Sequence, residues 1–503
     1  MSELDFQNAL SRDASALLKR LGVSGLADVF ADSRETRRGS LFLAYPGTAR
    51  DGRQYIQNAI TQGAAAALWE DDGTFCWNAD WTIPNLPARN LKFLEGAIAQ
   101  ELAGRPSEQI SLAAVTGTNG KTSVSQWIAR SWPERCAVIG TLGAGFPDDL
   151  ISTGLTTPTA ADMARLLREF SRNGAKACAL EASSIGIEEG RLNGLSVRFA
   201  IFTNFSRDHL DYHGTMACYA AAKERLFGWP GLKCAIINIE DALGRRIAQG
   251  QESMDLLTYR VANEEDPPEA HIEARDLAVT PAGQTFTLLT PWGTGRVATG
   301  LSGRFNIANL LAVAAVLLAA GLPLRETVTR LENLSAPSGR MERLSETDDS
   351  GRRAPLILVD YAHTPDALLN ALAALRPLAD ARGGRLICVF GCGGNRDPGK
   401  RPKMGEIAAQ TADALWVTSD NPRDEEPEAI IADILKGEGV SRAARVEPDR
   451  AAAITRAIAD AAPEDVLLIA GKGHEDYQEI CGIRHPFSDR EAARQALQAR
   501  VWA

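Results

Sequence analysis

The sequence predicts an α/β fold divided into three domains. A chain of 503 residues is longer than one domain usually is, since a domain takes roughly 100–200 residues, and 45% hydrophobic residues can supply several cores. Short apolar segments alternate with segments of helical spacing, which is typical of a mostly parallel sheet. We expect a small N-terminal α/β domain at residues 1–89, a central domain at 90–337 and a C-terminal Rossmann-like α/β domain at 338–503.

The N-terminal segment shows helices and strands in turn. We expect a helix at Asp5–Leu21, strands at Gly39–Tyr45 and Ala64–Trp69, a linker holding Pro84 and Pro87, and a helix at Leu91–Leu102. The turn Asp32-Ser33-Arg34 precedes the first strand and, taken alone, is typical of a solvated turn.

The central domain begins with a glycine-rich turn. Ile110–Val115 predicts a buried strand, Gly117 and Gly120 interrupt it, and Thr122–Arg130 predicts a helix. Glycines let backbone N–H groups approach phosphate oxygens, and a helix N-terminus favours negative charge. Lys121 would reach the β- and γ-phosphates of a nucleotide, and the Thr122 hydroxyl would bind Mg²⁺. Val115 stands where the common P-loop pattern has glycine. The layout still predicts a P-loop ATPase-like domain, against the alternative of an ordinary strand-to-helix turn.

Further strands of this domain end at polar side chains. Predicted strands at Lys176–Leu180 and Arg198–Thr203 are followed by Glu181 and by a loop containing His209. Ligands bind beyond the carboxyl ends of parallel strands, so both side chains could face Mg²⁺ near Thr122. The alternatives are a helix-start carboxylate for Glu181 and an ordinary loop histidine for His209. The same pattern predicts a strand at Lys233–Asn238, an antiparallel insert at Ala270–Thr299 and a helix from Gly303 to Ala320.

The C-terminal segment repeats the alternation. We expect strands at Leu356–Val359, Arg385–Phe390, Leu415–Thr418 and Val466–Ala470, each followed by a loop rich in glycine or charge. Thr364 and Pro365 predict a helix start, with threonine as the cap and proline in the first turn.

Composition excludes several classes of protein. A formal net charge of -10 argues against general binding to nucleic acid or to an anionic membrane. The longest apolar run, Leu310–Ala320, is too short to span a bilayer, and the N-terminus lacks a signal-peptide pattern. Eight scattered cysteines without a C-x-x-C pair indicate reduced thiols. We expect a cytoplasmic monomer with no membrane or nucleic-acid partner.

Several motifs together carry a family resemblance. Gly117-Thr-Asn-Gly-Lys-Thr-Ser123, Thr203-Asn-Phe-Ser-Arg-Asp-His209 and Gly303-Arg-Phe-Asn306 resemble the Mur ligases, the ATP-dependent amide-bond formers of peptidoglycan synthesis. Asp420-Asn-Pro-Arg423 and Gly471-Lys-Gly-His-Glu475 are similar to those of the members that add meso-diaminopimelate. The resemblance implies ATP and Mg²⁺ as cofactors, and UDP-N-acetylmuramoyl-L-alanyl-D-glutamate and meso-diaminopimelate as substrates. ATP would phosphorylate the D-glutamate γ-carboxylate, and the amine would attack the acyl phosphate.

The resemblance also implies a role for individual residues. Those implied for ATP are Gly117, Thr118, Asn119, Gly120, Lys121, Thr122, Ser123, Asn306, Arg340 and Asp360. Those implied for the UDP-muramoyl-dipeptide are Ser33, Thr48, Ala49, Arg50, Thr156, Thr157, Ser183, Glu189 and Arg191. Those implied for diaminopimelate are Arg396, Asp420, Asn421, Pro422, Arg423, Gly471 and Glu475. Thr122, Glu181, His209 and Lys223 would be the metal ligands, with Lys121, Glu181, His209 and Lys223 catalytic.

Lys223 has two interpretations. Helical spacing alone favours a solvated lysine, whereas the resemblance implies an N6-carboxylysine, a lysine carbamylated by CO2, as an anionic ligand near Mg²⁺.

Three positions depart from the family pattern: Leu155 stands in place of Asn, Glu189 in place of Gln and Ile185 in place of His. They affect substrate contacts more than the reaction. The alternatives are a sister ligase that adds L-lysine or uses another acceptor, and a catalytically inactive nucleotide-binding regulator. The Asp-Asn-Pro-Arg loop argues against lysine, and the intact Lys121, Glu181, His209 and Lys223 argue against a regulator.

Overall fold

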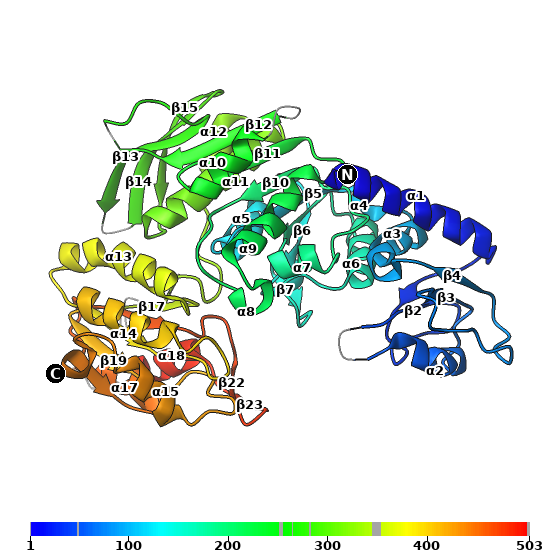
Figure 1. Cartoon of the computed structure of the whole chain (residues 1–503). Helices are drawn as coiled ribbons and strands as arrows, with labels where there is room; N and C mark the ends of the chain where they lie inside the picture. The colour runs from blue at the N-terminus through cyan, green and yellow to red at the C-terminus, as the bar shows by residue number, and fades with distance from the viewer. Residues whose placement is uncertain are drawn as a thin grey trace. The chain divides into compact units, whose positions relative to one another are not determined.

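The computed structural model describes residues 2–47, 50–250, 255–263, 265–280, 283–344 and 354–499. The chain forms two compact units, one of residues 1–258 with 315–321 and one of residues 259–314 with 322–503. Each unit contains parallel strands and flanking helices, and each is described by itself (Figure 1).

The first unit begins with a four-stranded parallel sheet in the order β1-β2-β3-β4. Its strands are β1 (Val29–Phe30), β2 (Leu41–Ala44), β3 (Ala66–Glu70) and β4 (Asn85–Ala88), and η1 (Gly52–Tyr55) and α2 (Ile56–Thr61) follow β2. The first helix, α1 (Glu3–Leu21), starts at a Ser2 capping box. The predicted proline linker was wrong, because Pro87 lies within β4, opposite Trp69 of β3. A strand at the edge of a sheet tolerates proline, since a missing N–H there costs no ladder hydrogen bond.

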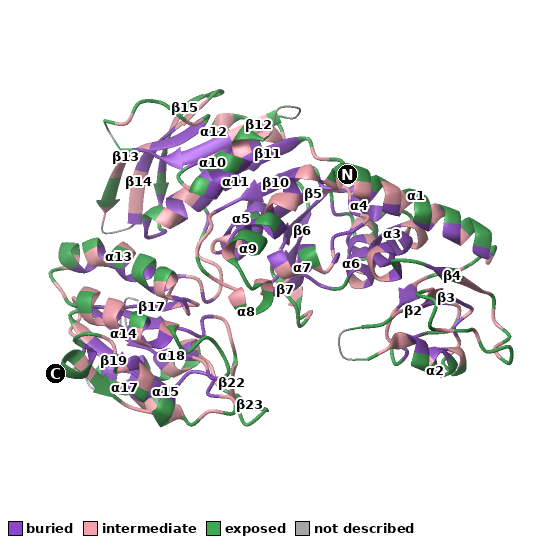
Figure 2. Cartoon of the chain, viewed as in Figure 1, coloured by how far each residue is buried: buried purple, intermediate pink, exposed green. Residues whose placement is uncertain are grey.

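A second, larger sheet carries the glycine-rich turn. Within the first unit its strand order is β11-β10-β5-β9-β6-β7-β8. The strands are β5 (Ser111–Thr116), β6 (Cys136–Gly140), β7 (Gly143–Phe146), β8 (Asp149–Ile151), β9 (Ala177–Glu181), β10 (Phe199–Phe202) and β11 (Cys234–Asn238). Strands β11 to β6 pair in parallel, and β7 and β8 add antiparallel strands at the edge. Every residue of β6, β9, β10 and β11 is buried, which explains their continuous apolar runs (Figure 2). The strands β6 to β8 had no counterpart in the sequence prediction.

The helices of this unit flank or connect the strands. They are α3 (Leu91–Ala103), α4 (Pro106–Gln109), α5 (Lys121–Ser131), α6 (Ala160–Arg172), α7 (Ser184–Glu188), α8 (Leu210–His213), α9 (Met216–Glu224), η2 (Arg225–Gly228) and α10 (Ala242–Gln249). Helix α1 joins this part of the unit through Gln7, whose side-chain amide donates to Asn193 Oδ1 over 2.8 Å.

The second unit begins in β12 (Asp255–Val261), which pairs in parallel with β13 (Ile272–Thr280). Strands β13, β14 (Gly283–Thr290) and β15 (Gly293–Thr299) are antiparallel, so the predicted antiparallel insert is confirmed. Helices α11 (Arg304–Ala319) and α12 (Leu324–Glu332) follow.

The C-terminal sheet has the order β16-β17-β21-β18-β19-β20. Its strands are β16 (Glu342–Arg343), β17 (Leu356–Asp360), β18 (Leu386–Phe390), β19 (Ala414–Val417), β20 (Ala444–Val446) and β21 (Val466–Ala470), all parallel except β16. Its helices are α13 (Pro365–Arg382), α14 (Lys400–Thr411), α15 (Pro427–Ile434), α16 (Val440–Ala443), α17 (Arg450–Asp460) and α18 (Asp489–Ala499), and β22 (Tyr477–Ile480) and β23 (Ile483–Pro486) form a hairpin. Thr364 caps α13 as predicted, and its Oγ1 accepts from Ala367 N.

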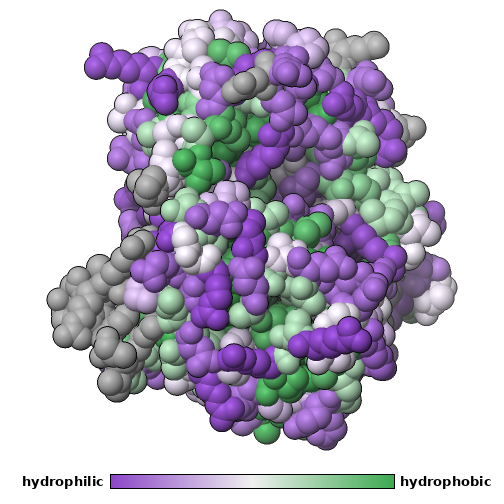
Figure 3. All heavy atoms as spheres, turned by 90° about the vertical axis from the view of Figure 1, so that its left-hand side faces the viewer, coloured by the Kyte–Doolittle hydropathy of each residue, from purple (hydrophilic) through white to green (hydrophobic). Residues whose placement is uncertain are grey.

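The surface shown in Figure 3 is mostly hydrophilic, with smaller hydrophobic patches between the polar side chains. In the described part of the chain, every helix is too short or too polar to cross a membrane.

Candidate active site

The glycine-rich turn between β5 and α5 is a backbone cradle. Gly117 has φ +147°, and a Cβ there would lie 1.9 Å from Thr203 Oγ1, so only glycine fits. The loop after β10 fixes the turn, because Asn204 accepts from Thr118 N through its carbonyl and from Asn119 N through Oδ1, over 2.8 and 2.9 Å. Gly120, at φ +86°, is the N-cap of α5. The turn is therefore fixed at the N-terminus of α5, a position where phosphate binding is favoured.

Lys121 is the first residue of α5, and its side chain lies back over the turn. Its Nζ donates to the carbonyls of Gly117 and Thr118 over 2.9 and 2.8 Å. The ammonium thus lies beside the backbone that would cradle a phosphate, which fits the role predicted for it.

Glu181 ends β9 beside the cradle. Its carboxylate accepts from Thr122 Oγ1 over 3.1 Å, from Thr141 N over 2.8 Å and from Thr141 Oγ1 over 3.0 Å. A Cβ on Gly140 would lie 2.2 Å from Glu181 Oε1, so the end of β6 leaves room for this carboxylate. The structure brings Glu181 and Thr122 together as predicted, and hydroxyl and carboxylate oxygens are suitable Mg²⁺ donors.

His209 lies in the loop after β10 and is the N-cap of α8, with φ +52°. Partial burial lowers the pKa of its imidazole, and Asp208 Oδ2 lies 3.5 Å from Nε2. In the part of the chain that the structure describes, no cluster of three His, Cys, Asp or Glu side chains could hold a metal without further donors. Thr122 and Glu181, which are hydrogen-bonded to each other, offer the hydroxyl and carboxylate oxygens that suit Mg²⁺, with phosphate oxygens and water as further donors.

Lys223 on α9 is buried, so it is not a solvated helix lysine. The residue is 1% exposed, its Nζ donates to Gly117 O over 2.8 Å, and Nζ lies 4.5 Å from the centre of the Tyr219 ring. Burial and the nearby Lys121 lower the pKa of Lys223 well below its ordinary value. The amine therefore lies at the cradle in a form that favours loss of its proton.

Most residues predicted for the muramoyl-dipeptide surround the same strand end. Thr157 Oγ1 donates to Glu181 O over 2.6 Å and lies 3.0 Å from Ser183 Oγ, and Arg191 Nη1 donates to Thr157 O over 3.0 Å. Thr156 Oγ1 lies 3.2 Å from Thr141 Oγ1. Glu189 pairs with Lys92 over 3.0 Å and accepts from Tyr212 OH over 2.9 Å.

Two of the residues predicted for uridine, Ser33 and Arg50, lie in the connections that follow β1 and β2. Ser33 is buried rather than solvated, and its Oγ accepts from Asn58 Nδ2 over 3.1 Å. Arg50 is exposed, and Thr48 and Ala49 lie outside the described residues.

The remaining predicted ATP residues lie in the second unit. Asn306 is buried on α11 and donates through Nδ2 to Ser302 O over 2.8 Å. Arg340 lies over the Tyr361 ring, with Cζ 4.6 Å from its centre. Asp360 ends β17 and accepts from Met341 N over 2.7 Å, and burial raises the pKa of this carboxyl.

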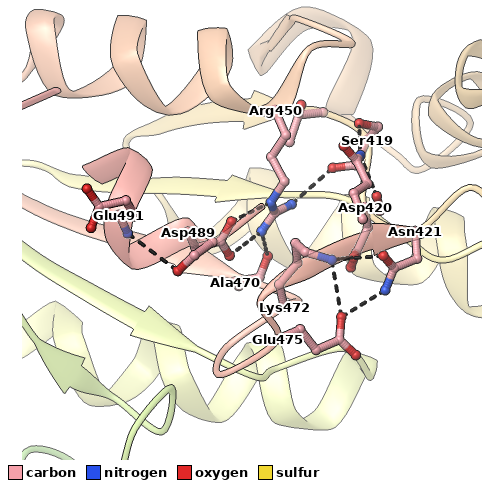
Figure 4. A network of polar contacts seen from close by, with 12 residues as sticks. Ser419, Asp420, Asn421, Arg450, Ala470, Lys472, Glu475, Asp489 and Glu491 are labelled. Carbon is pink, nitrogen blue, oxygen red and sulfur yellow. Dashed lines mark hydrogen bonds and ion pairs between the residues drawn. The ribbon is translucent and has the colours of Figure 1, made fainter. Parts of the chain in front are cut away.

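The loops after β19 and β21 meet, as Figure 4 shows for Asp420, Asn421 and Glu475. Asn421 Nδ2 donates to Glu475 Oε2 over 2.8 Å, and a Cβ on Gly471 would lie 2.7 Å from Asp420 Oδ2. The sequence prediction that these residues share one strand-end edge is therefore consistent with the geometry.

Arg423 follows Pro422 and has φ +53°, in the left-handed region. Its Nη1 donates to Gly394 O over 2.7 Å, and its Nε lies 3.4 Å from Glu479 Oε2. Its side chain is 20% exposed. Arg396 is exposed in the loop after β18, where Nη1 donates to Asn395 O.

Three segments of the chain match domains of one known protein family. The Mur ligase middle domain matches residues 115–317, the glutamate ligase domain of Mur ligases matches 339–473, and the catalytic domain of the Mur ligase family matches 27–95. The chain belongs to the Mur ligase family. This Mur ligase is 46% identical over 489 residues to the UDP-N-acetylmuramoyl-L-alanyl-D-glutamate--2,6-diaminopimelate ligase of Chromobacterium violaceum, covering 96% of each chain. It is 47% identical to the ligase of that name from Pseudomonas aeruginosa, over 94% of this chain and 95% of the relative.

Solved structures agree with the fold. A structure of a UDP-N-acetylmuramoyl-L-alanyl-D-glutamate--2,6-diaminopimelate ligase aligns with a TM-score of 0.67 and 37% identity, over 94% of this chain and 95% of that chain. The Mycobacterium tuberculosis folylpolyglutamate synthase aligns with a TM-score of 0.61 at 17% identity, over 82% and 96% of the two chains, a similarity of fold alone. As a member of the Mur ligase family, the chain is an ATP-dependent ligase with the family's three-domain α/β architecture.

Three residues of this Mur ligase were missed by sequence reasoning. Thr141 follows β6, a strand that the sequence prediction lacked, and it holds both oxygens of Glu181. Lys472 lies inside a motif that was noted only for Gly471 and Glu475, although it is fully buried between Asn421 and Glu475. Arg450 lies at the start of α17, where no motif marked it.

Proposed function

We propose that this chain joins meso-diaminopimelate to the γ-carboxylate of D-glutamate in UDP-N-acetylmuramoyl-L-alanyl-D-glutamate, with ATP as the energy source. The observation that carries the proposal is the meeting of the Asp420–Arg423 loop with Gly471 and Glu475. Cations and carboxylates gathered at one sheet edge suit a ligand that carries both ammonium and carboxylate groups. The near full-length identity to ligases named for 2,6-diaminopimelate supports the same choice.

The proposed chemistry has two steps. A carboxylate is a poor electrophile, so its oxygen first attacks the γ-phosphorus of ATP, and the bond to ADP breaks. The neutral amine of diaminopimelate then attacks the acyl carbon, phosphate leaves, and the nitrogen loses a proton. Lys121 and the Gly117–Ser123 backbone would bind the phosphates. The resemblance implies Asn306, Arg340 and Asp360 for other contacts to ATP. Bound Mg²⁺ would neutralise charge on the transferring phosphoryl group, with Thr122, Glu181 and His209 among its ligands.

Lys223 is proposed to carry a carbamate. Its buried amine, with a pKa held well below the ordinary value, is suited to attack CO2 as a neutral nucleophile. A C–N bond forms, one C=O electron pair moves to oxygen, and the nitrogen releases a proton, so the neutral amine becomes a carbamate with anionic oxygen donors. The hydrogen bond that Lys223 Nζ donates to the carbonyl of Gly117 supports a role for this lysine at the glycine-rich turn.

Contacts to the muramoyl-dipeptide are proposed for Thr156, Thr157, Ser183, Glu189 and Arg191. Ser33 and the 48–50 loop would contact the uridine. The domain boundaries remain those proposed from the sequence, 1–89, 90–337 and 338–503.

Phosphate release with the UDP-dipeptide and a panel of amino acids tests the proposal. We expect ATP turnover that depends on meso-diaminopimelate and is far slower with L-lysine. Preference for lysine, or turnover with a folate instead of the UDP-dipeptide, would assign the chain to a sister ligase. Absence of turnover with every acceptor would favour the nucleotide-binding regulator.

A further inference from the structure

Lys472, directly after Gly471, is a fully buried cation between two loops of the proposed amino-acid site. Its side chain is 0% exposed. Nζ donates to Asn421 Oδ1 over 2.8 Å and to Glu475 Oε2 over 3.2 Å, and lies 3.6 Å from Asp420 Oδ1 (Figure 4). One ammonium therefore joins the loop after β19 to the loop after β21.

A second buried cation holds the backbone beneath these loops. Arg450 donates from Nη1 to Ser419 O and from Nη2 to Ala470 O, over 3.1 and 3.0 Å. Strand β18 lies between β19 and β21 in the sheet, so Arg450 joins the ends of two strands that do not pair with each other. Asp489 binds the same guanidinium through both oxygens over 2.7 Å, and both side chains are 0% exposed. The carboxylate of Asp489 thus balances the positive charge of Arg450.

The contacts of Lys472 continue to Arg423, whose guanidinium would pair with the far carboxylate that distinguishes diaminopimelate from lysine. Asn421 Oδ1, which accepts from Lys472, also accepts from Glu479 N over 3.0 Å. Glu479 O accepts from Arg423 N over 3.0 Å, and its carboxylate lies 3.4 Å from Arg423 Nε. The position of Asn421 therefore affects Glu475 on one side and Arg423 on the other.

Burying an ammonium removes its hydration, which is costly unless fixed partners replace the water. A methionine of similar length would fill the same space without that cost. We propose that Lys472 is a positioning residue that determines amino-acid specificity, by fixing Asn421 and Glu475 so that Arg423 and Glu475 are presented to one diamino dicarboxylic acid. The inference rests on the proposed function, since it concerns the amino-acid site of that reaction.

The test is Lys472→Met in the full chain, with steady-state kinetics for each substrate. We expect the KM for meso-diaminopimelate to rise tenfold or more, the KM for ATP and for the UDP-dipeptide to stay within twofold, and the ratio of kcat/KM for diaminopimelate to that for L-lysine to fall at least tenfold. A double-mutant cycle with Glu475→Gln tests the coupling. The fold-rise in KM for meso-diaminopimelate in the double variant should be at least threefold smaller than the product of the fold-rises in the two single variants, because Lys472 acts through Glu475.

Asp465→Asn is the matched control. Asp465 is buried at the amino end of β21, where its Oδ2 pairs with Arg385 over 2.7 Å. The Asp465→Asn substitution should lower the melting temperature and leave the ratio of kcat/KM for diaminopimelate to that for L-lysine unchanged. Should Lys472→Met fail to fold, Lys472→Gln keeps one polar contact and should give an intermediate ratio.

Two outcomes overturn the inference. A fall in kcat with both amino acids at unchanged KM and ratio, in either Lys472 variant, would mean that the residue serves folding alone. Additive effects with Glu475→Gln would mean that Lys472 does not act through that carboxylate. Wild-type enzyme that does not use diaminopimelate would instead refute the proposed function, which the same assay measures first.

Discussion

The proposed phosphate cradle of the first unit and the proposed amino-acid loops of the second are built in different ways. The cradle is short in sequence, since Gly117, Gly120 and Lys121 lie within five successive residues, and Asn204 of the loop after β10 holds its backbone. The amino-acid loops come from three strand ends, and buried ions such as Lys472 and Arg450 join two of them. A backbone cradle can accept phosphate whatever it is attached to, whereas side chains held by ion pairs can distinguish one amino acid from another.

Removing the cradle ammonium should have the largest effect. We expect Lys121→Ala to lower ATP turnover by at least about a hundredfold, because one preorganised charge at the transferring phosphate is lost. Binding of the UDP-dipeptide, measured by calorimetry, should change little, since Ser33 lies in the connection between β1 and β2 of a different sheet. Lys176→Ala, an exposed lysine just before β9, is the control. Turnover at the wild-type rate in Lys121→Ala would refute the phosphate-binding assignment.

Lys223→Ala should rank next. Loss of the proposed carbamate should remove most activity, and a short carboxylic acid added to the assay should restore part of it, because it supplies an oxygen anion in the vacated space. A carbamate carbon signal after exchange with labelled bicarbonate, absent in the variant, would identify the group directly. An active alanine variant together with no such signal would contradict the proposal.

Arg423→Ala tests the other region. A carboxylate at the far end of diaminopimelate would lose its partner, so we expect specificity to fall by about 2–5 kcal/mol, with lysine use changed far less. The smaller value is favoured because Arg423 is partly exposed and already donates to Gly394 O. Lys436→Ala, on an exposed lysine of the same unit, controls for surface charge. Equal weakening with both amino acids would show that another residue selects the substrate.

The smallest expected effect concerns pH and His474, beside the amino-acid loops. Burial, with Arg340 and Arg490 nearby, lowers the pKa of His474 to about 4, and its Nδ1 has no hydrogen-bond partner among the described residues. Between the ordinary histidine pKa of about 6.5 and about 4, the unfolded chain takes up a proton that the folded chain does not. Unfolding free energy should therefore fall as the pH drops through this window, by up to about 2 kcal/mol at pH 5.

Denaturant titration of the wild type and His474→Gln at pH 8 and pH 5 measures this contribution. The variant should lose less stability than the wild type between the two pH values. Equal losses would mean that His474 is not held neutral.

The difference between the two regions also explains what the sequence could predict. The cradle, Glu181 and most central strands were identified because their signals are local: glycine spacing, a helix start and continuous apolar runs. Strand β6 and Thr141 were not, although Cys136–Gly140 is buried throughout.

Long-range contacts were beyond the sequence for a physical reason. Lys472 and Asn421 are separated by 51 positions, and Arg450 and Asp489 by 39, so no periodicity relates them. A lysine in a loop is usually solvated. Lys472 is buried because the strand order β21-β18-β19 brings the loops after β19 and β21 to the same edge of the sheet. The sequence motif includes Lys472, but only the folded structure shows that this lysine is buried.

Pro87 in β4 has a consequence for behaviour in concentrated solution. An edge strand offers a row of unpaired backbone groups to which a strand of another molecule can add, and such addition leads to aggregates. Strand β4 closes one side of the four-stranded sheet. Because proline has no N–H, this short edge cannot present a continuous row of donors. The residue that concealed the strand in the sequence therefore also protects the protein against sheet extension by its own copies.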